Sequence, residues 1–241
     1  MRPLERRSGT PLYAQLQHRL LERLRRERPG ELLPTQHQLA SEFGTSLITV
    51  KRALHELARR GHLESTRGRG TVVTRPVVSD DRSSVASWTD TMTGLGRQPR
   101  TVSSRVRVRV PSRPAARLLG LRARARTVRL ERERTLDGSP FCIMTNELPL
   151  DLVPDLAREG LHEESLYAWL RSRYDLVPSR AEEEVEARPP LPRERLFLGS
   201  DTRIVLVVRR RSRLADGRTL ELAEMVAPAG RYRYHVEIVK A

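Results

Sequence analysis

Two arginines stand two residues apart in a segment whose pattern is typical of a half-buried strand. From residue 127 to residue 136 the side chains alternate, which places five residues on one face: Val128, Leu130, Arg132, Arg134 and Leu136. A guanidinium held away from water requires a carboxylate or a bound anion, because an uncompensated buried charge is strongly destabilising. Internal pairing with Glu221 or Glu147 is one solution, and the alternation alone favours it. The other is a pocket for phosphate or carboxylate oxygens, which suit paired guanidiniums.

A second group of residues has the chemistry of DNA recognition. An apolar repeat at i, i+3, i+4 and i+7 gives one helix a buried side: Val50, Ala53, Leu54 and Leu57. The free side, which a major groove can accept, carries Ser46, Thr49, Lys51 and Arg52, with Leu47 and Ile48 beside them. Further along, Arg69 stands between Gly68 and Gly70. Glycines let a hairpin tip approach a sugar-phosphate wall, so we expect Arg69 to enter the minor groove.

These residues require a scaffold of three helices and a hairpin. Thr35 and Gln38 have the spacing of a capping box, Gly44 ends the helix that they begin, and Gly61 ends the next. The predicted order is a helix over 11–26, a helix over 35–44, a helix over 45–61, and strands over 62–66 and 71–74. This is the order of a winged helix-turn-helix. The alternative is a small helical pair and a hairpin with a solvated basic face.

The rest of the chain is predicted to be an antiparallel sheet with short helices. Helices are expected over 85–95, 114–119 and 166–174, and strands over 102–110, 127–136, 140–148, 180–187, 202–214, 219–226 and 232–239. Asp137-Gly138 is the predicted hairpin turn. The strand over 102–110 has Val106, Val108 and Val110 on its apolar face. Residues 79–84 are polar and turn-rich. The fold class is therefore α+β. We expect a DNA-binding domain over 1–75, a linker and the start of the second domain over 76–100, and the rest of that domain over 101–241.

Composition points to a polyanionic partner and away from an enzyme. The 241 residues carry a formal net charge of +15. Residues 1–75 hold 15 Lys/Arg and 7 Asp/Glu, and the remaining 166 hold 30 and 23, so charge per residue is about twofold higher at the N-terminal end. The one cysteine, Cys142, forms no internal disulfide. We find no zinc spacing, phosphate loop, nucleophile elbow, signal peptide or membrane span. We expect a soluble cytoplasmic protein without cofactor, metal or catalytic residues.

Residues 10–75 resemble the GntR family of bacterial transcription regulators. The motifs that carry the resemblance are Pro11-Leu12-Tyr13, Pro29 to Thr35, Leu39-Ala40, Phe43-Gly44, Thr49 to Leu54, Leu57, Gly61 and Gly68 to Thr71. Two positions depart from it: Gln36 replaces a usual acidic residue, and Leu47 replaces an arginine that often reads DNA. The resemblance implies that this domain docks on DNA as the family does, while the bases that it prefers stay open. The expected DNA contacts are Thr35, Ser46, Thr49, Lys51, Arg52, Gly68, Arg69 and Gly70.

Residues 85–240 resemble the UTRA effector-binding domain of the HutC branch of these regulators, which has a chorismate-lyase-like fold without the enzyme activity. The matching motifs are Arg132-Glu133-Arg134, Asp137 to Pro140, Leu148-Pro149, Ser165-Leu166-Tyr167 and Arg231 to Tyr234. The resemblance implies that an anionic group is held by two serines and the strand arginines, with a tyrosine beside them: Ser87, Ser165, Arg132, Arg134 and Tyr167. Glu221 stands where an acidic residue usually contacts the polar part of the effector.

Two departures alter the implied pocket. Met144 stands where the family commonly has a polar group, and Ala227-Pro228-Ala229-Gly230 replaces a run similar to Tyr-Arg-Gly-Asp. The residues implied to hold the anionic group are therefore retained, while those implied to contact a sugar are changed. A sugar phosphate and another small acid both stay open as effectors.

The function expected from these patterns is a homodimeric transcriptional repressor that binds an approximately palindromic operator and is released by a small anionic metabolite. A constitutive DNA-binding repressor whose C-terminal domain only dimerises is the first alternative. A chorismate-lyase-like enzyme with a DNA-binding head is the remote one.

Overall fold

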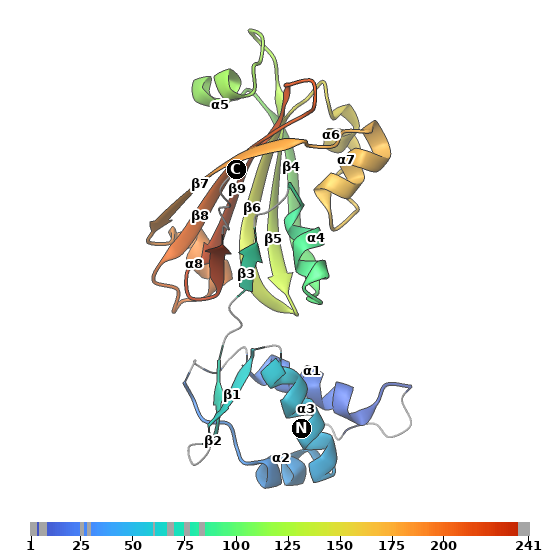
Figure 1. The fold of residues 1–241 in the computed structure, drawn as a ribbon, viewed down its shortest axis with the longest axis vertical. Coiled ribbons are helices and arrows are strands. Elements are labelled where there is room, and N and C mark those ends of the chain that lie inside the picture. The colour runs from blue at the N-terminus through green and yellow to red at the C-terminus, as the bar shows by residue number, and fades with distance from the viewer. Residues whose placement is uncertain are drawn as a thin grey trace, which may run out of the picture. The chain divides into compact units, whose positions relative to one another are not determined.

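The computed structural model of the chain describes residues 4, 9–24, 27, 30–59, 61–66, 70–74, 78–81 and 85–235. It divides into two compact units, Met1–Val78 and Ser79–Ala241, each of which is described by itself (Figure 1). Unit 1 is mainly helical with a small hairpin, and unit 2 is built on a six-stranded antiparallel sheet. The predicted α+β class is confirmed.

Unit 1 consists of three helices and two strands: α1 (Leu12–Leu24), α2 (Gln36–Phe43), α3 (Leu47–Arg59), β1 (Leu63–Thr66) and β2 (Gly70–Val73). The predicted capping box begins α2: the backbone N–H of Thr35 donates to Gln38 Oε1 at 2.8 Å, and the N–H of Gln38 donates to Thr35 Oγ1 at 3.3 Å. Gly44 ends α2 in the left-handed region, at φ +59°. This conformation is one that a glycine adopts without strain.

The helices of unit 1 meet in one apolar core. Fully buried side chains come from all three: Leu16, Leu20, Leu39, Val50, Ala53 and Leu57. Each large aliphatic side chain removed from water contributes roughly 1.5–3 kcal/mol. The wing is wider than predicted, because residues 30–33 pair with β2. There the N–H of Leu33 donates to the carbonyl of Thr71, and the N–H of Val73 donates to the carbonyl of Glu31, both at 2.8 Å.

Unit 2 is organised around a sheet of order β4-β5-β6-β9-β8-β7. Its strands are β4 (Pro99–Arg109), β5 (Thr127–Leu136), β6 (Ser139–Pro149), β7 (Arg180–Arg188), β8 (Val205–Arg213) and β9 (Thr219–Pro228). Its helices are α4 (Trp88–Gly94), α5 (Arg113–Leu118), α6 (Pro154–Glu159), α7 (Leu166–Tyr174) and α8 (Pro192–Leu198). The hairpin of β5 and β6 turns at Asp137 and Gly138, with φ of 50° and 76°, as the Asp-Gly pair predicts.

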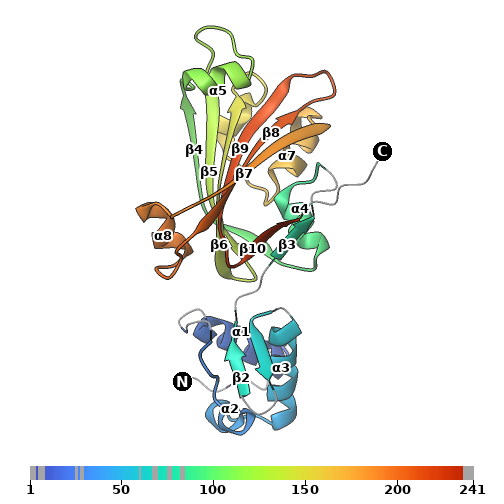
Figure 2. The same cartoon turned by 60° about the vertical axis from the view of Figure 1, so that its left-hand side comes forward.

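The two faces of the sheet carry different helices, and Figure 2 shows α7 and α8 on opposite sides of it. On one face, Val128, Leu130 and Leu148 pack with α6 and α7. On the other, Leu198 of α8 packs with Val205 and other residues of β8 and β9. Helices α6 and α8 were not predicted. The inward arginines of β5 lie on the sheet face that α7 covers. Val128, Leu130, Arg132 and Arg134 share this face because successive side chains of a strand point to opposite faces.

Two sequence expectations for unit 2 are wrong, and the first concerns the apolar face of β4. A β-bulge between Thr101 and Ser103 interrupts β4, and Val102 is 59% exposed. Val110 lies beyond the end of β4 and is 73% exposed, so only Val106 and Val108 face the core.

The second wrong expectation concerns residues 79–84, which were predicted to be polar and turn-rich. Residues Val78–Asp81 form β3, which pairs with β10 (Tyr232–His235) in a separate two-stranded sheet. Their partner lies about 150 residues away, and local composition therefore gave no signal for the pairing. The part of the predicted last strand after residue 235 lies outside the described residues.

Candidate DNA-binding surface and anion pocket

The amino-terminal end of α3 is capped by the hydroxyl of Ser46. The N–H of Thr49 donates to Ser46 Oγ at 3.2 Å, and the two hydroxyl oxygens are 2.9 Å apart. Lys51 and Arg52 are exposed on the side that faces away from the core. The structure thus brings four of the predicted DNA contacts together on one helix.

Arg52 has a defined position on the surface of unit 1. Its guanidinium carbon lies 4.0 Å from the centroid of the Tyr13 ring of α1. A cation over an aromatic face is attracted by the ring quadrupole, so Tyr13 restrains the arginine. This contact, which joins residues of two helices, was not predicted from the sequence.

The remaining predicted DNA contacts that the structure describes are Thr35 at α2 and Gly70 in β2. The Thr35 hydroxyl serves the capping box of α2. Gly70 has φ +94°, and a Cβ placed on it would approach Leu32 Cδ2 at 3.2 Å, so both conformation and space favour glycine. Gly68 and Arg69 lie outside the described residues.

In unit 2, a small pocket on the α7 face of the sheet collects five of the seven predicted effector-binding residues: Ser87, Arg132, Met144, Tyr167 and Glu221. Asn146 and Trp88 also line it, and its volume is about 50 Å³. Arg134 lies behind the pocket wall, fully buried, with its guanidinium carbon 5.0 Å from the centroid of the Trp88 ring. Ser165 reaches the pocket through Ser87, since the two hydroxyl oxygens are 3.2 Å apart.

Neither candidate carboxylate pairs with the two buried arginines. Arg132 Nη2 donates to Asn146 Oδ1 at 3.1 Å, and its Nη1 donates to the carbonyl oxygen of Glu164 at 3.5 Å. Glu147 faces the other side of the sheet, where its carboxylate lies 3.7 Å from Arg109 Nε. Glu221 accepts hydrogen bonds from other groups. Internal pairing with Glu221 or Glu147 is therefore wrong.

Glu164, in the loop between α6 and α7, supplies the acceptors instead. Arg134 Nη1 donates to its carbonyl oxygen at 2.8 Å, and the Thr89 hydroxyl donates to the same atom at 3.0 Å. The Glu164 carboxylate lies 3.4 Å from Arg134 Nη2, and its side chain is 33% exposed. Among the described residues, this partly solvated carboxylate forms the direct ion pair with the buried arginines, whereas Glu221 acts on Arg132 through its charge, without contact.

The electrostatics of the pair reflect burial and mutual repulsion, which the charges of Glu221 and Glu164 offset only in part. Burial, and then the neighbouring charge of Arg134, lower the pKa of Arg132 to about 10. Burial also lowers the pKa of Arg134. The Nε atoms of both arginines and Nε1 of Trp88 are buried without a hydrogen-bond partner among the described residues. Three donors around one pocket are unsatisfied, which is unusual in a folded protein.

Two serine caps meet beside the arginines. Ser87 Oγ accepts from the N–H of Asp90 at 3.0 Å and begins α4. Ser165 Oγ accepts from the N–H of Ala168 at 3.2 Å and begins α7. The positive end of the α7 dipole therefore points toward the same region as the guanidiniums.

At the opposite end of the pocket, both oxygens of the Glu221 carboxylate accept hydrogen bonds. Asn146 Nδ2 donates to Glu221 Oε2 at 2.7 Å, and the Tyr167 hydroxyl donates to Oε1 at 2.5 Å. The Ser212 hydroxyl donates to the same oxygen at 3.1 Å. Burial and the charge of Glu221 raise the pKa of Tyr167, so that it stays a phenol. Asn146 thus connects Arg132 with Glu221.

Sequence analysis missed Asn146, Trp88 and Glu164. The first had a signal: Asn146 is a polar residue on the inward face of β6, two residues from Met144 and opposite Leu130 of β5. Glu164 had none, because the atom that contacts both arginines is a backbone carbonyl in a loop.

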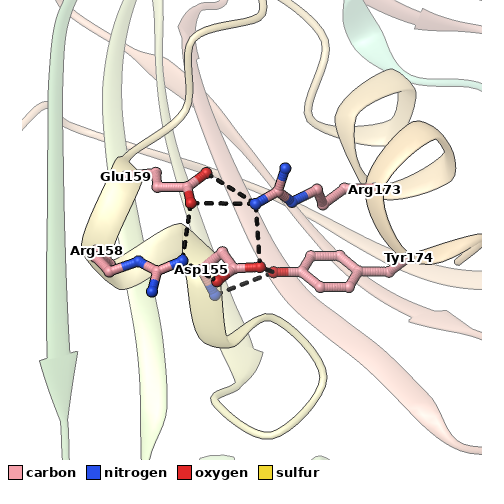
Figure 3. A network of polar contacts seen from close by, with 5 residues as sticks. All are labelled: Asp155, Arg158, Glu159, Arg173 and Tyr174. Carbon is pink, nitrogen blue, oxygen red and sulfur yellow. Dashed lines mark hydrogen bonds and ion pairs between the residues drawn. The ribbon is translucent and has the colours of Figure 1, made fainter.

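Helix α7, which carries Ser165 and Tyr167, is fixed at its other end by a network of polar contacts with α6 (Figure 3). The hydroxyl of Tyr174 donates to Asp155 Oδ2 at 3.0 Å and accepts from the Asp155 N–H at 3.0 Å. Arg173 Nη2 donates to Glu159 Oε1 at 3.1 Å. The hydrogen bond from Tyr174 lowers the pKa of Asp155.

Within the described ranges, no helix is long and apolar enough to cross a membrane. Over the same part of the chain, no group of three or more His, Cys, Asp or Glu side chains is placed to hold a metal ion.

Comparison with known proteins supports the resemblance. Residues 12–73 match the model of the bacterial regulatory proteins of the gntR family, and residues 94–233 match the UTRA domain. NagR of Bacillus subtilis, an HTH-type transcriptional repressor, is 27% identical over 235 residues, covering 96% of each chain. PhnF of Mycolicibacterium smegmatis, also an HTH-type transcriptional repressor, is 32% identical over 176 residues, covering 73% of this chain and 71% of PhnF.

Structural similarity agrees with these matches. The crystal structure of PhnF from Mycobacterium smegmatis aligns with a TM-score of 0.65 at 28% identity, covering 94% of this chain and 100% of that one. The chain therefore belongs to the GntR family of DNA-binding bacterial regulators, with a helix-turn-helix domain followed by a UTRA domain.

Proposed function

We propose that this regulator is a repressor whose affinity for its operator is set by a small anion bound at Arg132 and Arg134. The observation that carries the proposal is the pair of buried guanidiniums opposed by one partly exposed carboxylate. Their Nε donors are unsatisfied among the described residues. A phosphate or carboxylate group would supply the missing charge and several acceptors at once.

The anion competes with Glu164. The carbonyl oxygen of Glu164 accepts from Arg132, Arg134 and Thr89, so it occupies the place that an anion's oxygen would take. The pocket volume of about 50 Å³ is also far below the roughly 300–1,000 Å³ of ordinary ligand sites. Binding therefore requires movement of the Glu164 loop or of Met144. Because Ser165 follows Glu164 directly and caps α7, such movement changes the start of that helix.

The remainder of the effector meets a mixed environment. Met144, Met225, Val208 and Ala223 give the pocket an apolar wall, and Asn146 and Glu221 give it a polar end. These groups favour a compact acid with an apolar part and a hydrogen-bond donor directed at Glu221. A sugar phosphate would place several hydroxyls against Met144 and Met225, which offer weak acceptors at most.

On the DNA side, we propose a homodimer of the HutC type that places one α3 in each half of an approximate palindrome, in the cytoplasm. Lys51 contacts phosphates or base edges, and Thr49, Ser46 and Thr35 line the approach. Arg52 reaches the groove from its position on Tyr13. The wing glycines and Arg69 contact the adjacent minor groove.

The test is binding to the DNA upstream of the protein's own gene, measured by fluorescence anisotropy at several salt concentrations. A panel of sugar phosphates and small carboxylic acids is added in turn. We expect one class of anion to weaken binding in the parent and to have no effect on Arg134→Ala. Arg107→Ala, which removes an exposed arginine of β4, is the matched control and should respond like the parent. Specific binding that no anion changes would contradict effector control.

A constitutive repressor is the second candidate, because one observation favours it. At the polar end of the pocket, both carboxylate oxygens of Glu221 already accept hydrogen bonds, from Asn146, Tyr167 and Ser212. That candidate predicts an operator affinity indifferent to every anion. We do not propose an enzyme, since the relatives are regulators.

A further inference from the structure

We infer that Ile48 is a specificity-determining residue that contacts the 5-methyl group of a thymine in the operator. Ile48 lies in the first turn of α3 and is 79% exposed. The inference goes beyond effector control and rests only on DNA binding by the helix-turn-helix domain.

The placement of Ile48 on the helix is unusual for an apolar side chain. The buried side of α3 is formed by Val50, Ala53, Leu54 and Leu57. The exposed side, at i, i+3, i+4 and i+7, is formed by Ile48, Lys51, Arg52 and His55. Ile48 is thus the apolar member of a polar and basic side, and it stands at the amino-terminal end of that side, the part of a recognition helix that reaches base edges.

The neighbours of Ile48 cannot take over that role easily. The hydroxyls of Ser46 and Thr49 are hydrogen-bonded to each other, and the Ser46 hydroxyl also caps the helix. Arg52 is stacked on Tyr13 one turn further along. Leu47, the residue before Ile48, is apolar too. The first turn therefore presents branched hydrocarbon where a base-reading helix commonly presents hydrogen-bonding groups.

The chemistry of the major groove then selects the base. Its edges consist of hydrogen-bond donors and acceptors, with one apolar group, the C5-methyl of thymine. An isoleucine placed against a donor or acceptor would leave that group dehydrated and unpaired, which opposes binding. Against thymine, both partners remove apolar surface from water. Burial of one methyl-sized group strengthens binding by about fourfold.

The test uses deoxyuridine, which differs from thymidine only by this methyl group. Each thymine of the protein's operator is replaced by uracil in turn, and binding of the full chain is measured at fixed salt. For the parent, we expect one thymine in each half-site whose replacement weakens binding by about three- to fivefold. For Ile48→Ala, the thymine and uracil operators should bind equally at that position. Alanine is a good helix former, so the variant keeps α3.

Leu196→Ala is the matched control. It removes an apolar side chain of α8 that is 89% exposed in the UTRA domain, and it should keep the full thymine–uracil difference. If no uracil replacement weakens the parent, or if Ile48→Ala keeps the same difference, the inference is overturned. Loss of all specific binding by the parent would instead contradict DNA recognition itself, so the two failures are distinguishable.

Discussion

Replacement of Arg132 by methionine should stabilise the UTRA domain while abolishing its response to anions. Arg132 is buried, and its charged form is disfavoured in the folded protein. Buried charges are often replaced by apolar side chains of similar volume with no loss of stability, and sometimes with a gain. Methionine is flexible enough to fill the space of the arginine stem.

The size of the effect follows from the pKa of Arg132. A fall from 12.5 to about 10 corresponds to about 3 kcal/mol that opposes the cation in the folded state. Because the folded pKa is the lower one, this destabilisation is present in full below about pH 10 and diminishes above it. Removal of the guanidinium also leaves Asn146 Oδ1 without that donor, which costs about 1–2 kcal/mol. We expect a net gain of about 1–2 kcal/mol at pH 7.5.

The measurement is urea unfolding followed by tryptophan fluorescence. The sequence contains two tryptophans, Trp88 and Trp169, and both lie in the UTRA domain, so the signal reports that domain in the full chain. The buffer must lack phosphate, sulfate and carboxylates. Added effector anion should raise the free energy of unfolding of the parent, by about 2.7 kcal/mol at 100 times its Kd. It should leave Arg132→Met unchanged.

Arg107→Met, an exposed arginine on the neighbouring strand, is the control and should stay within about 0.5 kcal/mol of the parent. A variant Arg132→Met that is less stable than the parent by more than about 1 kcal/mol, with Arg107→Met unaffected, would refute the reasoning. In that case the arginine would be stabilised by its internal partners, and the pocket would have no need of an anion.

Three further results are expected. Tyr13→Ala should weaken operator binding about two- to fivefold by anisotropy, because the stacked Arg52 loses a restraint worth about 0.5–1 kcal/mol; an unchanged affinity would show that the stacking has no role in DNA binding. Asp155→Asn should lower the urea midpoint slightly, and the difference from the parent should shrink in high salt. A large loss of stability that does not depend on salt would contradict the interpretation of this network as a set of exposed ion pairs. Anion affinity, followed by titration of the tryptophan signal, should fall as pH rises through about 10, where Arg132 deprotonates; a flat profile would argue against Arg132 as the anion's partner.

The sequence predicted the burial of the arginines but not their partners. Alternation along β5 is a local property, so Val128, Leu130, Arg132 and Arg134 could be assigned to one face directly, and all four are buried. The acceptor for both arginines is the carbonyl of Glu164, about 30 residues away in a loop. A backbone atom has no sequence signature.

Elsewhere in the fold, the elements that could not be predicted depend on pairing between distant segments. The Asp137-Gly138 turn was predictable because a tight hairpin turn needs left-handed backbone at two adjacent residues, and Asp and Gly adopt that conformation readily. The bulge beside Val102 and the strand over 78–81 were not, because each depends on the register with a partner strand that the local sequence does not encode.

The arrangement around α7 indicates how the proposed anion binding would be converted into movement. A ligand shifts a conformational equilibrium only by its different affinity for the two states. An anion that takes the place of Glu164 binds only when that residue has withdrawn, so its full binding energy favours the withdrawn state. Ser165 must move with Glu164, whereas Tyr174 at the other end of α7 is held to Asp155 by two hydrogen bonds. We therefore expect α7 to respond by rotation about its Tyr174 end, with the largest displacement at Ser165.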